Sequence, residues 1–406
     1  MNTNQSRISW PILILFGILF SIAPFSIDMY LPAFPDIEKS LGLDSGSVGM
    51  SLSSYFVGML VGILIYGPVS DRYGRRTPLL IGMAAYSVAS LALAQSESLT
   101  WLVSWRFLQA ISGCVGSVLV QAIIRDLWAP EQAAHILSLL MMAMGVAPVI
   151  SPMIGAWVLE TFGWQQIFYC LFALGIASFV GTLLLFNESL PPSRRTQELK
   201  FLQVMRVYGL LFRNRIFMGY LSGQAFAAGA MFAYIAGSPY VLMDMYGVDA
   251  GDFGKYFALN AVGLILFSQL NRMLLSRFKP EFILRVFLYL PFVGGSMLMV
   301  NQVLGLDEFS LVLSGFFLVV ASLGGINANA SALAMAGQMD NSGQASAMIG
   351  ACTFGTGMLG SFMVSYLHDG SSFPVAICIV TFSLTALLLN HLLVSRLSSN
   401  PDSGLS

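Results

Sequence analysis

Apolar stretches of about 18 or more residues recur along the whole chain, from Pro11 to Val394. Coiled as an α-helix, each stretch is long enough to cross the ~30 Å hydrocarbon core of a lipid bilayer. A lipid-exposed span must satisfy its own backbone hydrogen bonds, which favours helices. Only 10% of the 406 residues are charged, whereas a soluble protein carries about 25%. The sequence therefore predicts an all-α membrane protein.

We expect twelve transmembrane helices and no cleaved signal peptide. The first apolar stretch runs into Asp28, Tyr30 and two prolines without a small-residue cleavage site. The spans are predicted near residues 11–31, 48–68, 77–95, 100–123, 136–158, 165–186, 216–241, 254–275, 282–302, 310–335, 344–367 and 373–394. Lysines and arginines gather in the connections after even-numbered spans and at the termini, except for Lys39, Arg106 and Lys255. Because positive charge stays in the cytoplasm, both termini are expected to be cytoplasmic.

The longest polar segment divides the chain into two groups of six spans. We predict an N-terminal half at residues 1–186, a cytoplasmic linker at 187–215 and a C-terminal half at 216–406. A shift of about 205 residues lays the first span on the seventh, so we expect two pseudo-symmetric six-helix halves. Two such halves that face each other across a midplane site are typical of transporters.

The segment GPVSDRYGRR ends the second span. Its glycines permit a tight turn, and its aspartate can pair with the arginines. The full pattern resembles the signature loop of the major facilitator superfamily, where the loop is a latch between helices of different halves. The residues expected to form this conformational latch are Gly67, Asp71, Arg72, Gly74, Arg75 and Arg76.

Two further segments resemble motifs of the same superfamily. WRFLQAISG places Arg106 and Gln109 as in the superfamily's fourth-span motif. MGVAPVISPMIGA resembles the fifth-span antiporter motif of exporters, with Ala147 and Ala156 where glycine is usual. Prolines remove backbone donors and bend a helix, whereas glycines allow close helix approach. The residues expected to form this hinge are Gly145, Pro148, Pro152 and Gly155.

The opening stretch DMYLPAFP, with IIRDLW and GSPYVLMDMYGV farther along, resembles the Bcr/CflA branch of proton-coupled drug antiporters. The resemblance runs the length of the chain. It implies the twelve-helix major facilitator fold, the inner membrane of a Gram-negative bacterium, and export driven by protons. The branch also contains purine nucleoside transporters, so a nucleoside remains an alternative substrate.

Asp28 is the one carboxylate that lies inside a predicted span, and Arg106 lies at a similar depth in the fourth span. The two side chains can therefore pair. Burial favours the neutral carboxyl group and a guanidinium favours its anion, which can poise Asp28 to take up and release a proton. We expect Asp28 and Arg106 to couple transport to protons, one per cycle, and a single buried acid argues against dications as substrates. A fixed ion pair and a hydrated cap at the helix end are the alternatives.

Polar and aromatic residues on the spans that line the cavity in this superfamily, and on their neighbours, are candidates for binding substrate. Aromatic rings can stack on a planar ligand, and amides can fix its orientation. Each can instead serve as an interhelical hydrogen bond or an interfacial aromatic. The candidates are Tyr30, Tyr55, Gln109, Gln121, Gln224, Tyr234, Asn260, Asn327 and Asn329.

Several other activities are not expected. The chain has no GxxxxGK[ST] loop, which argues against ATP as the energy source. A GxGxxG pattern at Gly355, Gly357 and Gly360 lies inside an apolar span and predicts close helix packing. We expect a monomer in the bilayer that binds a small molecule, with protons as the coupling ion and with no metal, other cofactor or nucleic acid. A membrane receptor that binds without transport is the rival from another class, and an enzyme is not expected.

Overall fold

The computed structural model describes residues 10–196, 201–338 and 341–394. Twelve of the helices in these ranges are long and apolar enough to cross a membrane, which confirms the predicted all-α fold. They are α1 Trp10–Asp28, α3 Gly49–Tyr73, α4 Arg76–Ala94, α5 Leu99–Leu127, α6 Pro130–Phe162, α7 Gln165–Leu185, α9 Arg215–Pro239, α10 Ala250–Leu274, α11 Pro280–Val303, α12 Phe309–Met335, α13 Ser342–Tyr366 and α14 Phe373–Val394. Arg7, Lys200 and Arg396, which belong to the predicted charge pattern, lie outside the described residues.

The first membrane-spanning helix ends slightly earlier than predicted. The span was expected to reach residue 31, but α1 ends at Asp28. The 3-10 turn η1 Leu31–Ala33 and the short helix α2 Phe34–Leu41 follow. Pro32 and Pro35 stand in the first turns of these two elements, where a missing backbone N–H leaves no helical bond unmade. The prolines therefore mark where the chain leaves the direction of α1.

Other short elements were not predicted from the sequence. The polar segment between the halves contains η2 Pro192–Arg194 and the amphipathic helix α8 Phe201–Arg213. A π-helical segment, η3 Tyr240–Met245, extends α9. The helix predicted at residues 136–158 is longer at both ends, since α6 begins at Pro130 and ends at Phe162.

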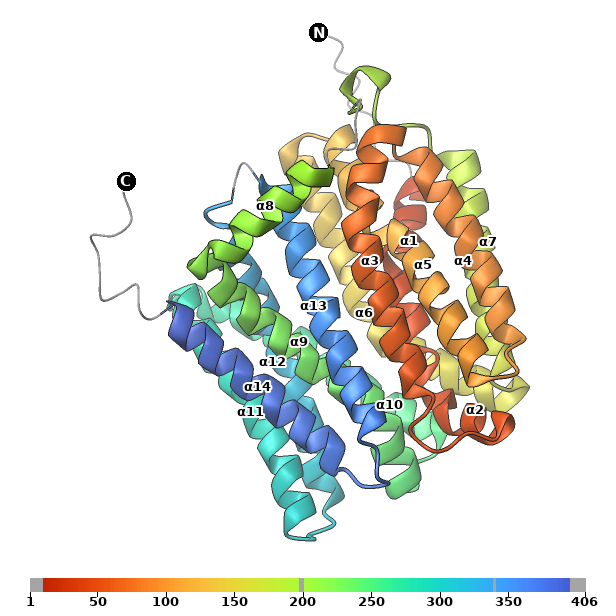
Figure 1. Cartoon of the computed structure of the whole chain (residues 1–406), viewed down its shortest axis with the longest axis vertical. Coiled ribbons are helices and arrows are strands. Elements are labelled where there is room, and N and C mark those ends of the chain that lie inside the picture. The colour runs from red at the N-terminus through yellow and green to blue at the C-terminus, as the bar shows by residue number, and fades with distance from the viewer. Residues whose placement is uncertain (1–9, 197–200, 339–340, 395–406) are drawn as a thin grey trace.

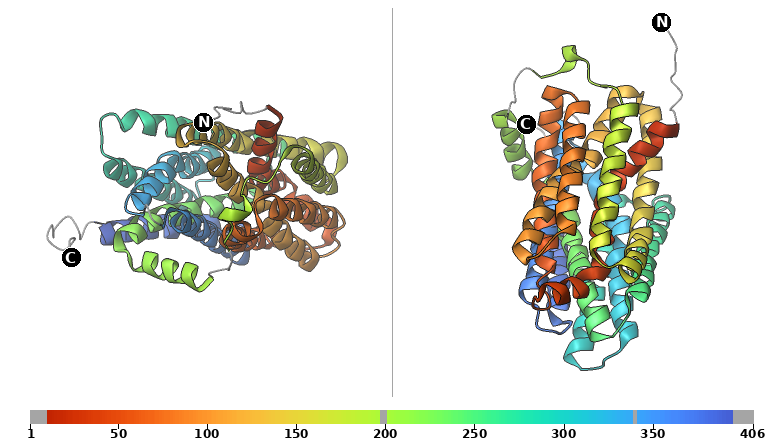
Figure 2. Two further views of the ribbon diagram at one scale, coloured as in Figure 1. Left: turned by 90° about the horizontal axis from the view of Figure 1, so that it is seen from above. Right: turned by 90° about the vertical axis from the view of Figure 1, so that its right-hand side faces the viewer.

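The long helices form one elongated bundle with two ends. Figures 1 and 2 show α8 and the start of α1 at the same end, which we call the terminal face. Because α1 ends and α3 begins at the other end, we call that end the opposite face. Helix α2 lies at the opposite face and contacts η3 (Figure 1). We refer to α1–α7 as the N-terminal half and to α9–α14 as the C-terminal half.

The GxGxxG pattern serves helix packing, as predicted. A methyl group on Gly360 would lie 2.5 Å from the carbonyl oxygen of Gly229 in α9. A methyl group on Gly357 would collide with the ring of Phe232, also in α9. Glycine at these positions lets α13 and α9 approach closely, as small residues do in membrane bundles.

The two halves meet mainly through α3 with α13 and through α6 with α10. Ser53 in α3 donates a hydrogen bond to Ser361 in α13 at 2.9 Å. A side chain on Gly254 in α10 would lie close to the backbone of Pro152 and Met153 in α6. In Figure 1, α3 and α13 lie side by side toward the opposite face and diverge toward the terminal face. Ser53 and Ser361 therefore join the halves on the side where these two helices converge.

Candidate functional site

Asp28 is the last residue of α1 and is only 4% exposed. Its carboxylate accepts a hydrogen bond from the Ser151 hydroxyl of α6 at 3.4 Å. Helix α6 approaches closely here, since a methyl group on Gly155 would collide with the carbonyl group of Met29. Asp28 therefore lies in a packed junction between α1 and α6, and the alternative of a hydrated cap is wrong.

Arg106 is fully buried in α5. Its Nη1 donates to the carbonyl oxygen of Ser26 at 2.9 Å and to Oε1 of Gln109 at 2.7 Å. The guanidinium carbon lies 4.7 Å from the ring centroid of Tyr30 and 4.4 Å from that of Tyr55. Both separations are within the range of a cation–π interaction. The Arg106 side chain is thus held by two aromatic rings, an amide and a backbone carbonyl.

The expected pair of Asp28 with Arg106 is not formed. No ion pair found among the described residues includes either side chain. The tyrosine rings and the Ser26 carbonyl direct the guanidinium, and Ser151 approaches the carboxylate instead. Similar depth along two helices does not fix how each helix is rotated, so the pairing could not be decided from the sequence.

Some donors around Arg106 have no hydrogen-bond partner within the described part of the protein. They are Nε and Nη2 of Arg106 and the hydroxyl of Tyr55. Buried donors are nearly always satisfied in native proteins, so each unsatisfied one calls for an explanation. These three donors lie beside Tyr30 and Gln109, two of the predicted substrate-binding residues.

Tyr234 forms an aromatic cluster in the C-terminal half. Its hydroxyl accepts a hydrogen bond from Nδ2 of Asn260 at 2.9 Å, and its ring stacks on Phe257 at 5.7 Å. The ring centroid of Phe316 lies 4.8 Å from that of Tyr234. Two of the predicted substrate-binding residues, Tyr234 in α9 and Asn260 in α10, are thus hydrogen-bonded to each other.

The remaining candidates for substrate binding differ in what they contact. Gln224 accepts a hydrogen bond from Ser331 at 2.8 Å, and Asn329 donates to Asn271 at 2.7 Å. These two amides join helices of the C-terminal half, which fits the structural alternative. Gln121 is half-buried in α5, whereas Asn327 is exposed on α12. The hydroxyl of Tyr30 hydrogen-bonds with that of Ser51 at 2.7 Å, and Gln109 donates to Ser90 at 2.9 Å.

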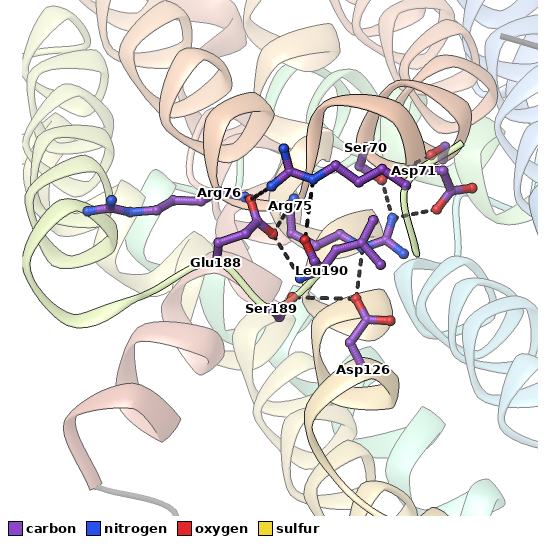
Figure 3. A network of polar contacts seen from close by, with 10 residues as sticks. Ser70, Asp71, Arg75, Arg76, Asp126, Glu188, Ser189 and Leu190 are labelled. Atoms are coloured by element: carbon purple, nitrogen blue, oxygen red, sulfur yellow. Dashed lines mark hydrogen bonds and ion pairs between the residues drawn. The ribbon is translucent and has the colours of Figure 1, made fainter. Parts of the chain in front are cut away.

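The signature loop forms a network of ion pairs at the terminal face (Figure 3). Arg75 lies 2.7 Å from Asp71 in α3 and 2.9 Å from Asp126 in α5. It also donates to the Ser70 hydroxyl at 2.6 Å. The two carboxylates together outweigh the effect of burial and raise the pKa of Arg75. Arg75 therefore stays charged and joins α3, α4 and α5.

Glu188 lies just beyond α7 and caps the start of α4 (Figure 3). Its carboxylate accepts hydrogen bonds from the backbone N–H groups of Arg75 at 2.8 Å, Leu190 at 3.0 Å and Arg76 at 3.3 Å. The Arg195 guanidinium lies 3.5 Å away. Burial alone raises the pKa of Glu188, but these donors and the guanidinium outweigh it, so its pKa lies below its ordinary value. The folded protein thus favours the Glu188 anion.

Gly74 is required by this cap. Its φ is +88°, a conformation that side chains disfavour, and a methyl group there would collide with Glu188. By contrast, a methyl group on Gly67 would have no atom within 4 Å. Arg72 lies outside the network, with its guanidinium carbon 5.3 Å from the ring centroid of Tyr73. Gly74 therefore leaves free the space that the Glu188 carboxylate occupies.

The expected latch between the two halves is not formed in this structure. Every ion pair and hydrogen bond described above for the network joins residues of the N-terminal half or the beginning of the linker. Figure 3 shows the same residues grouped around Arg75 and Glu188. With α3 and α13 apart at this face, Asp71 has no partner in the C-terminal half among the described residues.

The predicted hinge lies in an uninterrupted helix. Helix α6 continues through Pro148 and Pro152, so the prolines remove bonds without ending it. Gly155 packs on the chain just after α1, whereas Gly145 has open space around it. Ser151, between the prolines, donates to the carbonyl oxygen of Ala147 at 2.7 Å. The segment expected to bend therefore contains the residue that contacts Asp28.

Sequence reasoning missed several residues of these sites. Ser151 stood in the quoted hinge motif and Asp126 in the quoted segment IIRDLW, but neither was assigned a role. Glu188 was also assigned no role. Glu38 was assigned no role either, yet it is a buried acid, only 5% exposed. The argument against dications assumed that Asp28 is the single buried acid, so that argument no longer holds.

Comparisons with known proteins agree with the fold and the motifs. The family model for the Major Facilitator Superfamily matches residues 16–361. The uncharacterized MFS-type transporter YdgK of Bacillus subtilis is 33% identical over 401 residues, which cover 98% of each chain. The Bicyclomycin resistance protein homolog of Haemophilus influenzae is 29% identical over 398 residues, which cover 97% of this chain and 98% of that one.

A solved structure gives the same picture of the fold. A mutant of the nucleoside transporter NupG superimposes with a TM-score of 0.73 over 95% of this chain and 98% of that one. The two sequences are 13% identical, so the likeness concerns the fold alone.

Proposed function

Because the chain belongs to the major facilitator superfamily, we propose that it exports a small neutral or weakly charged organic molecule in exchange for protons. The likeness to the Bicyclomycin resistance protein homolog over almost the whole chain supports a drug, such as bicyclomycin or chloramphenicol, as the substrate. The antiporter-like segment of α6 supports export over uptake.

The orientation follows from charge. We propose that the terminal face is cytoplasmic and that the protein lies in the inner membrane of a bacterium, as a monomer. Arg75, Arg76, Arg195 and Arg213 lie in or beside the connections of this face, and positively charged connections stay in the cytoplasm. The opposite face then meets the outer side, and the halves are in contact there.

The observation that carries the proposal is the contact of Asp28 with Ser151. The Ser151 hydroxyl has one proton and two acceptors in reach, the carbonyl oxygen of Ala147 at 2.7 Å and the carboxylate of Asp28 at 3.4 Å. An ionised Asp28 competes for that proton, whereas a protonated Asp28 leaves it to Ala147. A serine bonded back to the preceding turn also favours bending of a helix.

Protonation of Asp28 can therefore change the shape of α6 between Pro148 and Pro152. Helix α6 contacts α10 of the other half, so such a bend bears on how the halves meet. A proton or a substrate shifts the balance between the two states only if it binds them with different affinity. We propose that Asp28 supplies this difference for the proton, and that Arg106, Tyr30 and Tyr55 act on the substrate.

A purine nucleoside is the second candidate substrate. The rings of Tyr234 and Tyr55 can stack on a base. The amide of Asn260 can hydrogen-bond to the edge of that base. The Tyr55 hydroxyl has no hydrogen-bond partner among the described residues, so it can bind a sugar or a base. Uptake of inosine compared with uptake of bicyclomycin, in vesicles with and without the protein, separates the two candidates.

The test replaces Asp28. In liposomes with an imposed pH gradient, Asp28→Asn should reduce transport of the substrate to the level of empty liposomes, because its side chain cannot release a proton. Binding measured without a gradient should persist. The matched control is Asp36→Asn, since Asp36 is exposed on α2 and lies outside the junction. Gradient-driven transport by Asp28→Asn at the rate of the control would contradict the proposal.

A further inference from the structure

Glu38 is a second buried carboxylate, at the opposite face. It lies on α2 and is 5% exposed, although its neighbours Asp36 and Lys39 are exposed. No ion pair includes Glu38 among the residues that the structure describes. A buried carboxylate without a cation is costly unless hydrogen bonds compensate it. The donors that it does contact indicate its role.

The donors come from both halves. Oε1 of Glu38 accepts a hydrogen bond from the backbone N–H of Val48 at 3.0 Å and from the hydroxyl of Tyr240 at 2.9 Å. That hydroxyl in turn accepts from the backbone N–H of Gly49 at 3.2 Å. Tyr240 belongs to η3 of the C-terminal half, whereas the other three residues belong to the N-terminal half. One tyrosine hydroxyl thus joins the halves at the start of α3.

The surroundings of Tyr240 are closely packed. Its ring packs on Phe34 at 5.9 Å and on His368 at 4.8 Å, and the residue is 3% exposed. Ser45 hydrogen-bonds with His368 at 3.1 Å and donates to Asp244 at 3.4 Å. These contacts of Ser45 also join the two halves, but they are exposed, whereas the hydrogen bond between Glu38 and Tyr240 is buried.

We propose that Glu38 and Tyr240 are positioning residues for transport, whose hydrogen bond stabilises the conformation closed at the opposite face. This inference rests on the proposed transport, in which the halves must separate at that face. Separation pulls Tyr240 away from Glu38 and from the start of α3. The Tyr240 hydroxyl, the backbone N–H of Gly49 and the Glu38 carboxylate must then be hydrated. An open surface depression of about 440 Å³, lined in part by Glu38, Lys39 and Asp244, lies on the solvent side of this junction.

The experiment compares Glu38→Gln and Tyr240→Phe by hydrogen–deuterium exchange in lipid nanodiscs, without substrate or pH gradient. The phenylalanine keeps the ring contacts and removes the hydroxyl. Loss of a hydrogen bond to a charged group shifts an equilibrium by about tenfold. Exchange should become faster by up to that factor in the opposite-face segments 42–52 and 362–372. It should become slower in the terminal-face segment 67–76, because opening one face closes the other.

Two comparisons keep the result specific. Tyr246→Phe is the matched control, since the Tyr246 hydroxyl accepts from Asn301 within the C-terminal half alone. The double variant Glu38→Gln, Tyr240→Phe should change exchange by less than the sum of the single changes, because both act on the same bond. The glutamine removes the charge from its acceptor, and the phenylalanine removes its donor.

Unchanged exchange, faster exchange at both faces, strictly additive effects, or the same change in Tyr246→Phe would each overturn the proposal. Faster exchange at both faces would mean general loss of structure. Since no substrate or gradient is used, the outcome is independent of whether Asp28 couples transport to protons.

Discussion

Ser151 links the candidate proton site to the helix that is expected to bend. A charged group inside a bilayer is costly, and the Asp28 carboxylate has a hydroxyl in reach rather than a cation among the described residues. The same hydroxyl bonds to the preceding turn of α6. The contact is therefore the smallest element in which a proton and a change of helix shape can be connected.

Removal of that hydroxyl should separate binding from transport. We expect Ser151→Ala to lower the maximal transport rate about tenfold, the effect of one lost hydrogen bond to a charged group. The substrate dissociation constant should change little. The matched control is Ser138→Ala, because Ser138 makes the same type of bond, to Ala134 at 2.8 Å, on the exposed part of α6. Equal transport rates for the two variants would show that Ser151 has no part in coupling.

At the level of helices and loops, the network around Arg75 and Glu188 holds the terminal ends of α3, α4, α5 and α7 together. Since the pKa of Glu188 is lowered on folding, its charge stabilises the protein above its ordinary pKa of 4.5. This contribution is lost as the pH falls through the lower pKa of the folded state. The network therefore predicts a specific dependence of stability on pH.

Glu188→Gln should lower the free energy of unfolding at pH 7 by about 1 kcal/mol, since the amide accepts the same N–H groups without a charge. The difference from the unmodified protein should be full above pH 4.5 and should shrink at lower pH. Thermal melting between about pH 3 and pH 7, on either side of the carboxyl pKa, measures it. Glu97→Gln, at an exposed loop position, should show no such trend. A difference that stays constant to the acid end of that range would argue against the capping role.

The sequence could predict the long elements because their cause is local. Apolar length sets where a chain crosses the bilayer, and α14 begins at the predicted residue, Phe373. It could not predict η1 and α2, which are short and held by their contacts. The Asp28 and Arg106 pairing depended on the rotation of two helices about their axes. The partners of the signature loop, Asp126 and Glu188, come from other elements, and no local pattern announces them.

For the whole molecule, the two faces differ in what joins the halves. At the opposite face the halves are joined by Tyr240 with Glu38 and by Ser53 with Ser361. At the terminal face the charged network stays within the N-terminal half and its linker. In this conformation the described contacts of the charged network therefore join no residue of the C-terminal half.

The central claim is that Asp28 carries the proton that is exchanged for the substrate, so substrate binding should release a proton from Asp28. Proton release on substrate addition tests it most directly, with purified protein in weakly buffered solution and a pH-sensitive dye as the probe. The account predicts that bicyclomycin, or the substrate found in the transport assay, releases protons from the unmodified protein and from Asp36→Asn, and releases none from Asp28→Asn. Proton release of the same size from Asp28→Asn, with binding intact, would contradict it.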